Sequence, residues 1–145
     1  MWTIINVFPL ILIPVLIYNI WAAGAGDAGM IGFVNELTNP QNPMTIEMAS
    51  GAKWAVTTGD LFVLVAMVLL FIELLKSTST GTAAIFNHAL SMLVFIVCLV
   101  EFLLWGACAT TPFFLITVMA LLDVLAGVVV TIISARRDVE FAGQH

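Results

Sequence analysis

Five ionisable side chains lie within long apolar stretches of the chain, namely Asp60, Glu73, His88, Glu101 and Asp123. Inserting a charged side chain near the middle of a membrane costs about 2.5–3.5 kcal/mol of free energy. Such a residue is therefore paired, neutralised by protonation or retained for a function. Carboxyl groups in such places can carry protons or bind ions, and a histidine can ligate a haem, a chlorin or a metal ion. These five residues are therefore the candidates for any chemistry.

The depth of each group follows from its position along a helix, because a helix rises about 1.5 Å per residue. Counted from the short connection near residue 108, Asp123 lies near the middle of the membrane, with Glu101 about 10 Å further out and His88 about 9 Å further in. Counted from the Ser- and Thr-rich connection near residue 79, Asp60 lies level with Glu101, and Glu73 lies level with His88. We therefore predict an outer pair, an inner pair and a single central acid.

Asp123 has two interpretations. In the functional one, its carboxyl group relays protons or binds an ion; in the structural one, it is neutral and donates a hydrogen bond to Ser91 or to a neighbouring subunit. Glu101 and Asp60 raise a similar choice, because they can share one proton or be hydrated near the outer surface. Both choices stay open. The residues favour a neutral, hydrogen-bonded Asp123, and they favour hydration of Glu101 and Asp60 over a shared proton.

Glu73 and His88, the inner pair, each have a simpler structural explanation. Glu73 and Lys76 stand three residues apart on one helical face, which predicts an ion pair whose charged ends reach toward water. A bis-histidine haem would need a second membrane histidine besides His88, and a metal site shared with Glu73 would need further ligands. We predict no cofactor, with a haem or pigment contact at His88 as the minor alternative. A hydrogen bond from His88 to Glu73 or to a group at the membrane surface is the favoured interpretation.

Small and polar residues form a stripe along each of the last two apolar stretches. At 100° per residue, one stripe holds Asn87, Ser91, Val94, Cys98 and Glu101, and the other holds Ala120, Asp123, Gly127, Thr131 and Ser134. Small residues let helices approach closely in lipid, and hydroxyl or amide groups bond across the contact. We therefore expect the two stripes to face each other.

The composition excludes a soluble domain and several functional classes. Hydrophobic residues make up 62% of the 145 residues and charged residues 9%, with a mean hydropathy of +1.15. A single soluble core of this size cannot bury so much apolar surface. No basic patch points to nucleic acid, and no phosphate-binding loop, H-E-x-x-H motif or nucleophile elbow points to an enzyme. Cys98 and Cys108 lie about 15 Å apart along a helix, too far to pair within the chain.

The apolar stretches predict a single all-α transmembrane domain over residues 1–145, with four spans near 4–23, 56–76, 83–106 and 113–134. The last two spans form an antiparallel hairpin at its centre, because their short connection allows only a tight return. We interpret the first span as a retained helix rather than a secretory signal, kinked at Pro9 and Pro14.

The segment 24–55 is expected to be an outer loop, because glycines punctuate its first half and a turn cluster follows at 39–43. Within it, residues 44–55 form either a short surface-lying helix or an irregular loop.

Basic residues predict the orientation. With four spans, Lys76, Arg136 and Arg137 fall on one side of the membrane, and Lys53 falls on the other. The side with more basic residues is usually cytoplasmic, so both termini are predicted to be cytoplasmic.

The region from Lys53 to Asp138 resembles a group of small bacterial inner-membrane proteins. The resemblance is carried by Gly59-Asp60-Leu61, Phe71 to Lys76, Asn87 to Ser91, Val100 to Leu104 and Ala135 to Asp138. It implies a four-helix protein of the bacterial inner membrane and brings no activity with it.

The expected function is that of an accessory or structural subunit, not of an enzyme. Four short helices with an almost charge-free surface bury little polar machinery, and small-residue faces favour contact with other membrane proteins, as in a respiratory or photosynthetic complex. The alternative is a small oligomeric transporter or channel in which Asp123, Glu101, Asp60 and Glu73 form a stepped path for protons or ions. The expected partners are membrane lipid and either other integral membrane proteins or further copies of the chain.

Overall fold

The computed structural model describes residues 7–76 and 82–142, and most of them are helical. The helices are α2 (Leu12–Thr38), α3 (Thr58–Lys76), α4 (Thr82–Leu104) and α5 (Thr111–Ala142), with a 3-10 turn, η1, at Gly106–Cys108. Two short strands, β1 (Met44–Glu47) and β2 (Lys53–Val56), pair antiparallel between α2 and α3. The predicted all-α class is confirmed for most of the chain, and a small β-ribbon adds to it.

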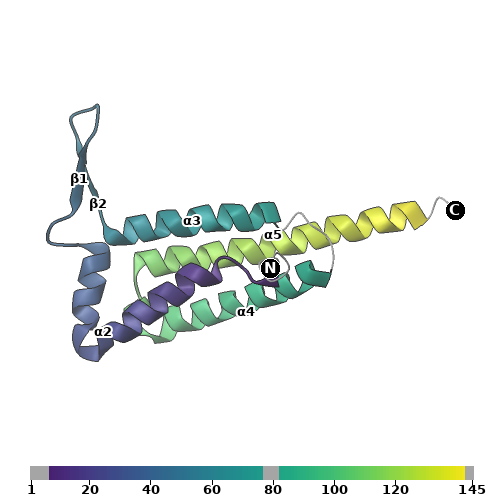
Figure 1. Cartoon of the computed structure of the whole chain (residues 1–145), viewed down its shortest axis with the longest axis horizontal. Coiled ribbons are helices and arrows are strands. Elements are labelled where there is room, and N and C mark those ends of the chain that lie inside the picture. The colour runs from purple at the N-terminus through teal and green to yellow at the C-terminus, as the bar shows by residue number, and fades with distance from the viewer. Residues whose placement is uncertain (1–6, 77–81, 143–145) are drawn as a thin grey trace.

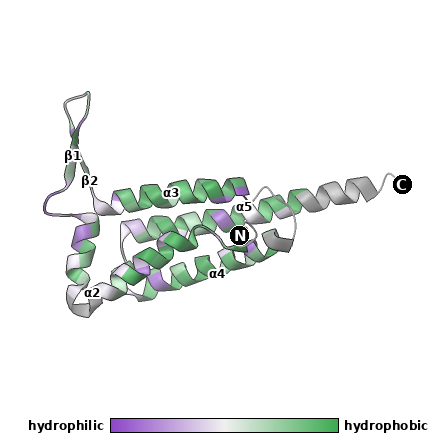
Figure 2. Cartoon of the chain, in the orientation of Figure 1, coloured by the Kyte–Doolittle hydropathy of each residue, from purple (hydrophilic) through white to green (hydrophobic). Residues whose placement is uncertain are grey.

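Three helices are long and apolar enough to cross a membrane, namely Thr58–Lys76, Ala84–Leu104 and Thr111–Ile133. They lie side by side (Figure 1), and apolar residues cover most of their length (Figure 2). The apolar part of α2, Leu12–Gly26, is shorter. Residues 4–6 of the predicted first span and the predicted turn at 77–80 lie outside the described residues, so the four-span arrangement stays a prediction.

Helix α2 bends at Gly26 rather than at a proline. Gly26 has φ 61° and ψ −179°, a backbone conformation that essentially only glycine adopts, and the chain turns sharply there (Figure 1). Pro9 precedes the helix, and Pro14 is its third residue, where a backbone N–H has no helical acceptor. The kink predicted at Pro14 is therefore wrong, because this residue lies in the first turn of α2, whereas the backbone at Pro9 is not helical and α2 begins three residues later.

The predicted outer loop at 24–55 contains regular structure. Residues 24–38 belong to α2, and residues 44–47 and 53–56 form the β-ribbon. We call residues 27–56, which comprise the second half of α2 and the ribbon, the arm. The arm runs across one end of the helical bundle, and the ribbon projects away from it (Figure 1).

The β-ribbon replaces both structures predicted for 44–55. Apolar Met44 and Ile46 alternate with Thr45 and Glu47, which is the period of a strand. The turn is closed by hydrogen bonds from Gly51 N–H to Met48 O at 2.8 Å and from Met48 N–H to Ala52 O at 2.9 Å, with Gly51 at φ 82°. The predicted surface helix and irregular loop are both wrong, because the two-residue period of this segment is that of a strand.

The core lies where α2 crosses α3 and α5, close to η1. Tyr18 is fully buried at its centre, and the Tyr18 hydroxyl group donates to the backbone oxygen of Ala107 at 2.9 Å. The ring of Tyr18 packs against three aromatic rings from three segments, those of Phe33, Phe62 and Phe113. This contact fixes the first half of α2 against the bundle.

Some details of the helix ends agree with the sequence and some do not. Pro112 lies in the first turn of α5, as predicted, but α5 continues to Ala142 rather than ending near 134.

Cys98 and Cys108 are free and buried, which confirms that they do not pair within the chain.

Candidate functional site

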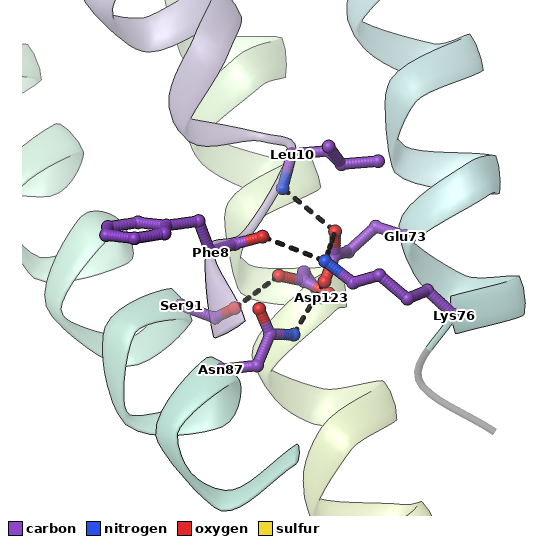
Figure 3. Close-up of polar contacts among 7 residues, drawn as sticks. All are labelled: Phe8, Leu10, Glu73, Lys76, Asn87, Ser91 and Asp123. Atoms are coloured by element: carbon purple, nitrogen blue, oxygen red, sulfur yellow. Dashed lines mark hydrogen bonds and ion pairs between the residues drawn. The ribbon is translucent and has the colours of Figure 1, made fainter. Parts of the chain in front are cut away.

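Glu73 is fully buried near the end of α3 and has partners from three segments. Its carboxylate accepts hydrogen bonds from Leu10 N–H at 2.8 Å and from Asn87 Nδ2 at 2.6 Å, and it pairs with Lys76 Nζ at 2.8 Å (Figure 3). Lys76 Nζ also donates to the backbone oxygen of Phe8 at 2.8 Å. These contacts tie the chain that enters α2 to the end of α3 and the start of α4.

The predicted ion pair between Glu73 and Lys76 is confirmed, but its surroundings differ from those expected. The side chain of Glu73 is 0% exposed and that of Lys76 is 13% exposed, so the charged groups do not reach freely into water. A buried pair requires additional hydrogen bonds, which Leu10 and Asn87 supply to Glu73. The expected exposure was wrong because the chain entering α2 covers the pair.

Asp123 is 1% exposed in α5 and contacts α4 directly. Ser91 Oγ donates a hydrogen bond to Asp123 Oδ2 at 2.6 Å, so the two residues are in contact as predicted, but Asp123 accepts this bond rather than donating it (Figure 3). Glu73, Lys76 and His88 lie near enough to act on Asp123 electrostatically. The central acid and Glu73 therefore belong to one polar cluster, which we define as Glu73, Lys76, Asn87, Ser91 and Asp123.

His88 packs against Gly127 on the facing helix α5. A Cβ atom at Gly127 would overlap the imidazole ring of His88, so the ring occupies the space that glycine leaves. The Nδ1 atom of His88 is buried, and it has no hydrogen-bond partner in the part of the chain that the structure describes. Within that part, no hydrogen bond joins His88 to Glu73, because other donors occupy the Glu73 oxygens. The predicted partner Glu73 is therefore wrong, and the alternative partner at the membrane surface stays a prediction.

The outer acids Asp60 and Glu101 have separate partners. Asp60 forms a capping box at the start of α3, in which Thr57 N–H donates to Asp60 Oδ2 at 2.9 Å and Asp60 N–H donates to Thr57 Oγ1 at 3.1 Å. Glu101 Oε1 accepts a hydrogen bond from Asn19 Nδ2 at 2.8 Å, while Glu101 Oε2 is buried without a partner among residues 7–76 and 82–142. No hydrogen bond links the two acids within those ranges.

Most of the two predicted stripes faces the interior. The buried members are Asn87, Ser91, Val94 and Cys98 on α4, and Ala120, Asp123 and Gly127 on α5. Thr131 is exposed instead, and its hydroxyl group donates to the backbone oxygen of Gly127 at 2.9 Å. The Ser91–Asp123 hydrogen bond and the packing of His88 on Gly127 join α4 to α5 along these stripes.

Two interior residues that the sequence did not single out complete these contacts. Asn19 holds Glu101, and Tyr18 reaches η1, across 82 and 89 residues of sequence respectively. Asn19 could have been identified from the sequence, because it is an amide residue within an otherwise apolar stretch. A tyrosine near the end of an apolar stretch is typical of an anchor at the membrane surface, but Tyr18 lies in the core.

The polar cluster is chiefly suited to holding helices together. Among the described residues, no group of three His, Cys, Asp or Glu side chains could hold a metal ion. Two buried polar atoms beside the cluster, Asn87 Oδ1 and His88 Nδ1, have no hydrogen-bond partner in the described ranges. A water molecule can satisfy these atoms by donating to Asn87 Oδ1 and by donating to or accepting from His88 Nδ1.

The second candidate site is the apolar face of the β-ribbon, formed by Met44, Ile46, Trp54 and Val56. Ile46 is paired with Trp54 and Met44 with Val56, so the four side chains share one face. Met44, Ile46 and Trp54 are 55%, 42% and 52% exposed, whereas Val56 at the base of the ribbon is buried. A two-stranded ribbon has little stability alone, and this face offers apolar area to a binding partner.

Comparisons with protein-family models, curated protein sequences and solved structures gave no match for this chain. The class that the fold defines is a mostly helical protein with three helices able to span a membrane. The resemblance to small bacterial inner-membrane proteins stays a prediction.

Proposed function

We propose that the chain is an accessory or structural subunit of the bacterial inner membrane that binds other integral membrane proteins. It spans the membrane four times, with α4 and α5 as the central hairpin and both termini in the cytoplasm. The observation that carries the proposal is the exposed apolar face of the ribbon, which projects from the end of the bundle at which α3 and α5 begin (Figure 1).

The position of the ribbon favours a partner within the membrane over a soluble one. Trp54, on the apolar face, lines one groove together with Val63 and Leu115. Val63 and Leu115 lie in the first two turns of two helices able to span a membrane. The apolar face is therefore turned toward the membrane, and a protein that packs beneath it is itself embedded there.

The interior supports the same proposal, because its acids are engaged within the chain. Glu73 has three donors, Asp60 caps its own helix, Glu101 holds Asn19 and Asp123 accepts from Ser91. A stepped carboxylate path would need these acids to lie in succession with exchangeable protons. Their separate partners favour a role in packing.

Photocrosslinking in native membranes tests the proposal. A photoreactive amino acid at Ile46, on the apolar face, should crosslink to another membrane protein, while one at the neighbouring Thr45, on the opposite face, should give several-fold less product. Purification in a mild detergent should recover the same partner in stoichiometric amount. Adducts with lipid alone at position 46, or equal protein adducts at both positions, would contradict the proposed surface.

A second candidate function is proton or ion transport by an oligomer, in which Asp123 is the working carboxyl group. It is favoured by the buried imidazole nitrogen of His88 that has no partner among the described residues, since a histidine close to a carboxyl group can take up and release protons. Flux into vesicles that contain the reconstituted protein should then be lost in Asp123→Asn and kept in Asp60→Asn. Absence of flux in the unmodified protein would dispose of this candidate.

A further inference from the structure

A groove of about 430 Å³ lies between the arm and the ends of α3 and α5 at which these helices begin. The arm supplies Leu37 and Trp54, α3 supplies Val63, and α5 supplies Pro112 and Leu115 to its apolar lining. Both α3 and α5 are long and apolar enough to cross a membrane, and the groove lies at their first turns, where a spanning helix meets the boundary between hydrocarbon and lipid headgroups. Trp54 is a residue type enriched at this depth.

The wall of the groove is preformed. A Cβ atom at Gly59, in the first turn of α3, would lie 2.5 Å from Leu37 O in the arm and 2.6 Å from Pro112 Cγ in α5. The arm, α3 and α5 therefore meet too closely at this point for any larger residue. Their close contact holds the two sides of the groove in fixed positions.

The polar lining of the groove consists of three threonines and one carboxylate. The threonines are Thr38, Thr57 and Thr111, and Asp60 is the charged residue of the lining. Asp60 is exposed, and Thr57 N–H occupies its Oδ2 atom. A ligand of this groove therefore meets apolar side chains on one side and negative charge with hydroxyl groups on the other.

We propose that the groove binds one phospholipid with an amine headgroup. The ammonium group lies against Asp60, and an acyl chain runs along Val63 and Leu115 toward the middle of the membrane. A cationic headgroup complements the charge of the carboxylate, whereas a lipid with an uncharged glycerol headgroup and a net negative charge is repelled by it. This inference does not rest on the accessory-subunit function, because the lipid can bind whether or not a partner protein is present.

Native mass spectrometry of the purified full chain tests the proposal with two lipids, phosphatidylethanolamine and phosphatidylglycerol. The unmodified protein should retain one phosphatidylethanolamine, with up to about fivefold preference over phosphatidylglycerol, since an exposed ion pair contributes about 0.2–1 kcal/mol. Asp60→Asn keeps an acceptor for the capping box, and it should remove the preference while leaving lipid binding in place.

Filling the groove should displace the lipid. Val63→Trp places a large side chain in the groove and should abolish the retained lipid, as should Leu115→Trp, which serves as the second variant if the first does not fold. Leu64→Trp is the matched control, because Leu64 is 56% exposed and does not line the groove. Equal retention of both lipids by the unmodified protein, preference for phosphatidylglycerol, or unchanged binding in folded groove-filling variants would each overturn the proposal.

Discussion

His88 and Gly127 show how a single residue sets the distance between two helices. The imidazole ring lies where a Cβ atom at position 127 would be, so α4 and α5 can approach as they do only because that atom is missing. Small residues have this role in membrane helices, where close packing replaces the hydrophobic effect as the force that joins them. The contact between His88 and Gly127 therefore has a structural role that does not depend on the function of Asp123.

Gly127→Ala should destabilise the protein by about 1–3 kcal/mol, the usual cost of overpacking a tight contact. Denaturant unfolding in detergent micelles measures this. The double variant with His88→Ala should recover most of the loss, because the displaced ring is then absent. Gly24→Ala is the control, since a Cβ atom there meets nothing within 4 Å. Equal stabilities of the Gly127→Ala and Gly24→Ala variants would refute the contact.

Gly26 has the corresponding role at the level of the element, because it separates the apolar half of α2 from the arm. Its φ of 61° with ψ of −179° is a conformation in which a side chain clashes with the backbone. The bend directs the second half of α2 across the end of the bundle (Figure 1). The position of the ribbon therefore depends on one residue without a side chain.

Gly26→Ala should either cost about 1–3 kcal/mol of stability or move the arm. Spin labels at Thr45 in the ribbon and at Leu64 on α3 detect a movement of the arm. The distribution of distances between the two labels should then shift or broaden. Gly32→Ala, in the same helix but without positive φ, should leave both stability and distance nearly unchanged. If Gly26→Ala also changes neither, the bend does not need glycine.

At the scale of the whole molecule, the charged ends of the bundle predict its orientation. Lys76 lies at the end of α3, and α5 runs on past residue 136 at that same end, whereas Lys53 lies in the arm at the opposite end (Figure 1). The end that carries Lys76 should face the cytoplasm by the positive-inside rule.

Labelling with a membrane-impermeant maleimide tests this orientation. In intact spheroplasts, a cysteine introduced at Ser50 in the ribbon should react, and one at Gln144 should react only after the membrane is opened. The native cysteines give little background. Burial and then the nearby Glu101 carboxylate raise the pKa of Cys108 to about 12, so almost none of it is thiolate at neutral pH, and its labelling should increase as the pH rises toward 12. The reverse pattern would place the arm in the cytoplasm.

The sequence by itself determined the helical class, three membrane-length helices, the Glu73–Lys76 pair and the Ser91–Asp123 contact. Each of these depends on local spacing, because apolar length and the 100° helical period can be counted along the chain. The sequence also contained the two-residue period of the ribbon, which was misinterpreted as a surface helix or loop.

The tertiary structure alone decided which polar groups meet. Leu10, Asn19 and Tyr18 reach partners more than sixty residues away. The fold of α2 back over the bundle brings them there, and no periodic pattern records such a contact. The burial of Glu73 and the groove beneath the arm follow from the same fold, because each depends on segments that are distant in sequence coming together in space.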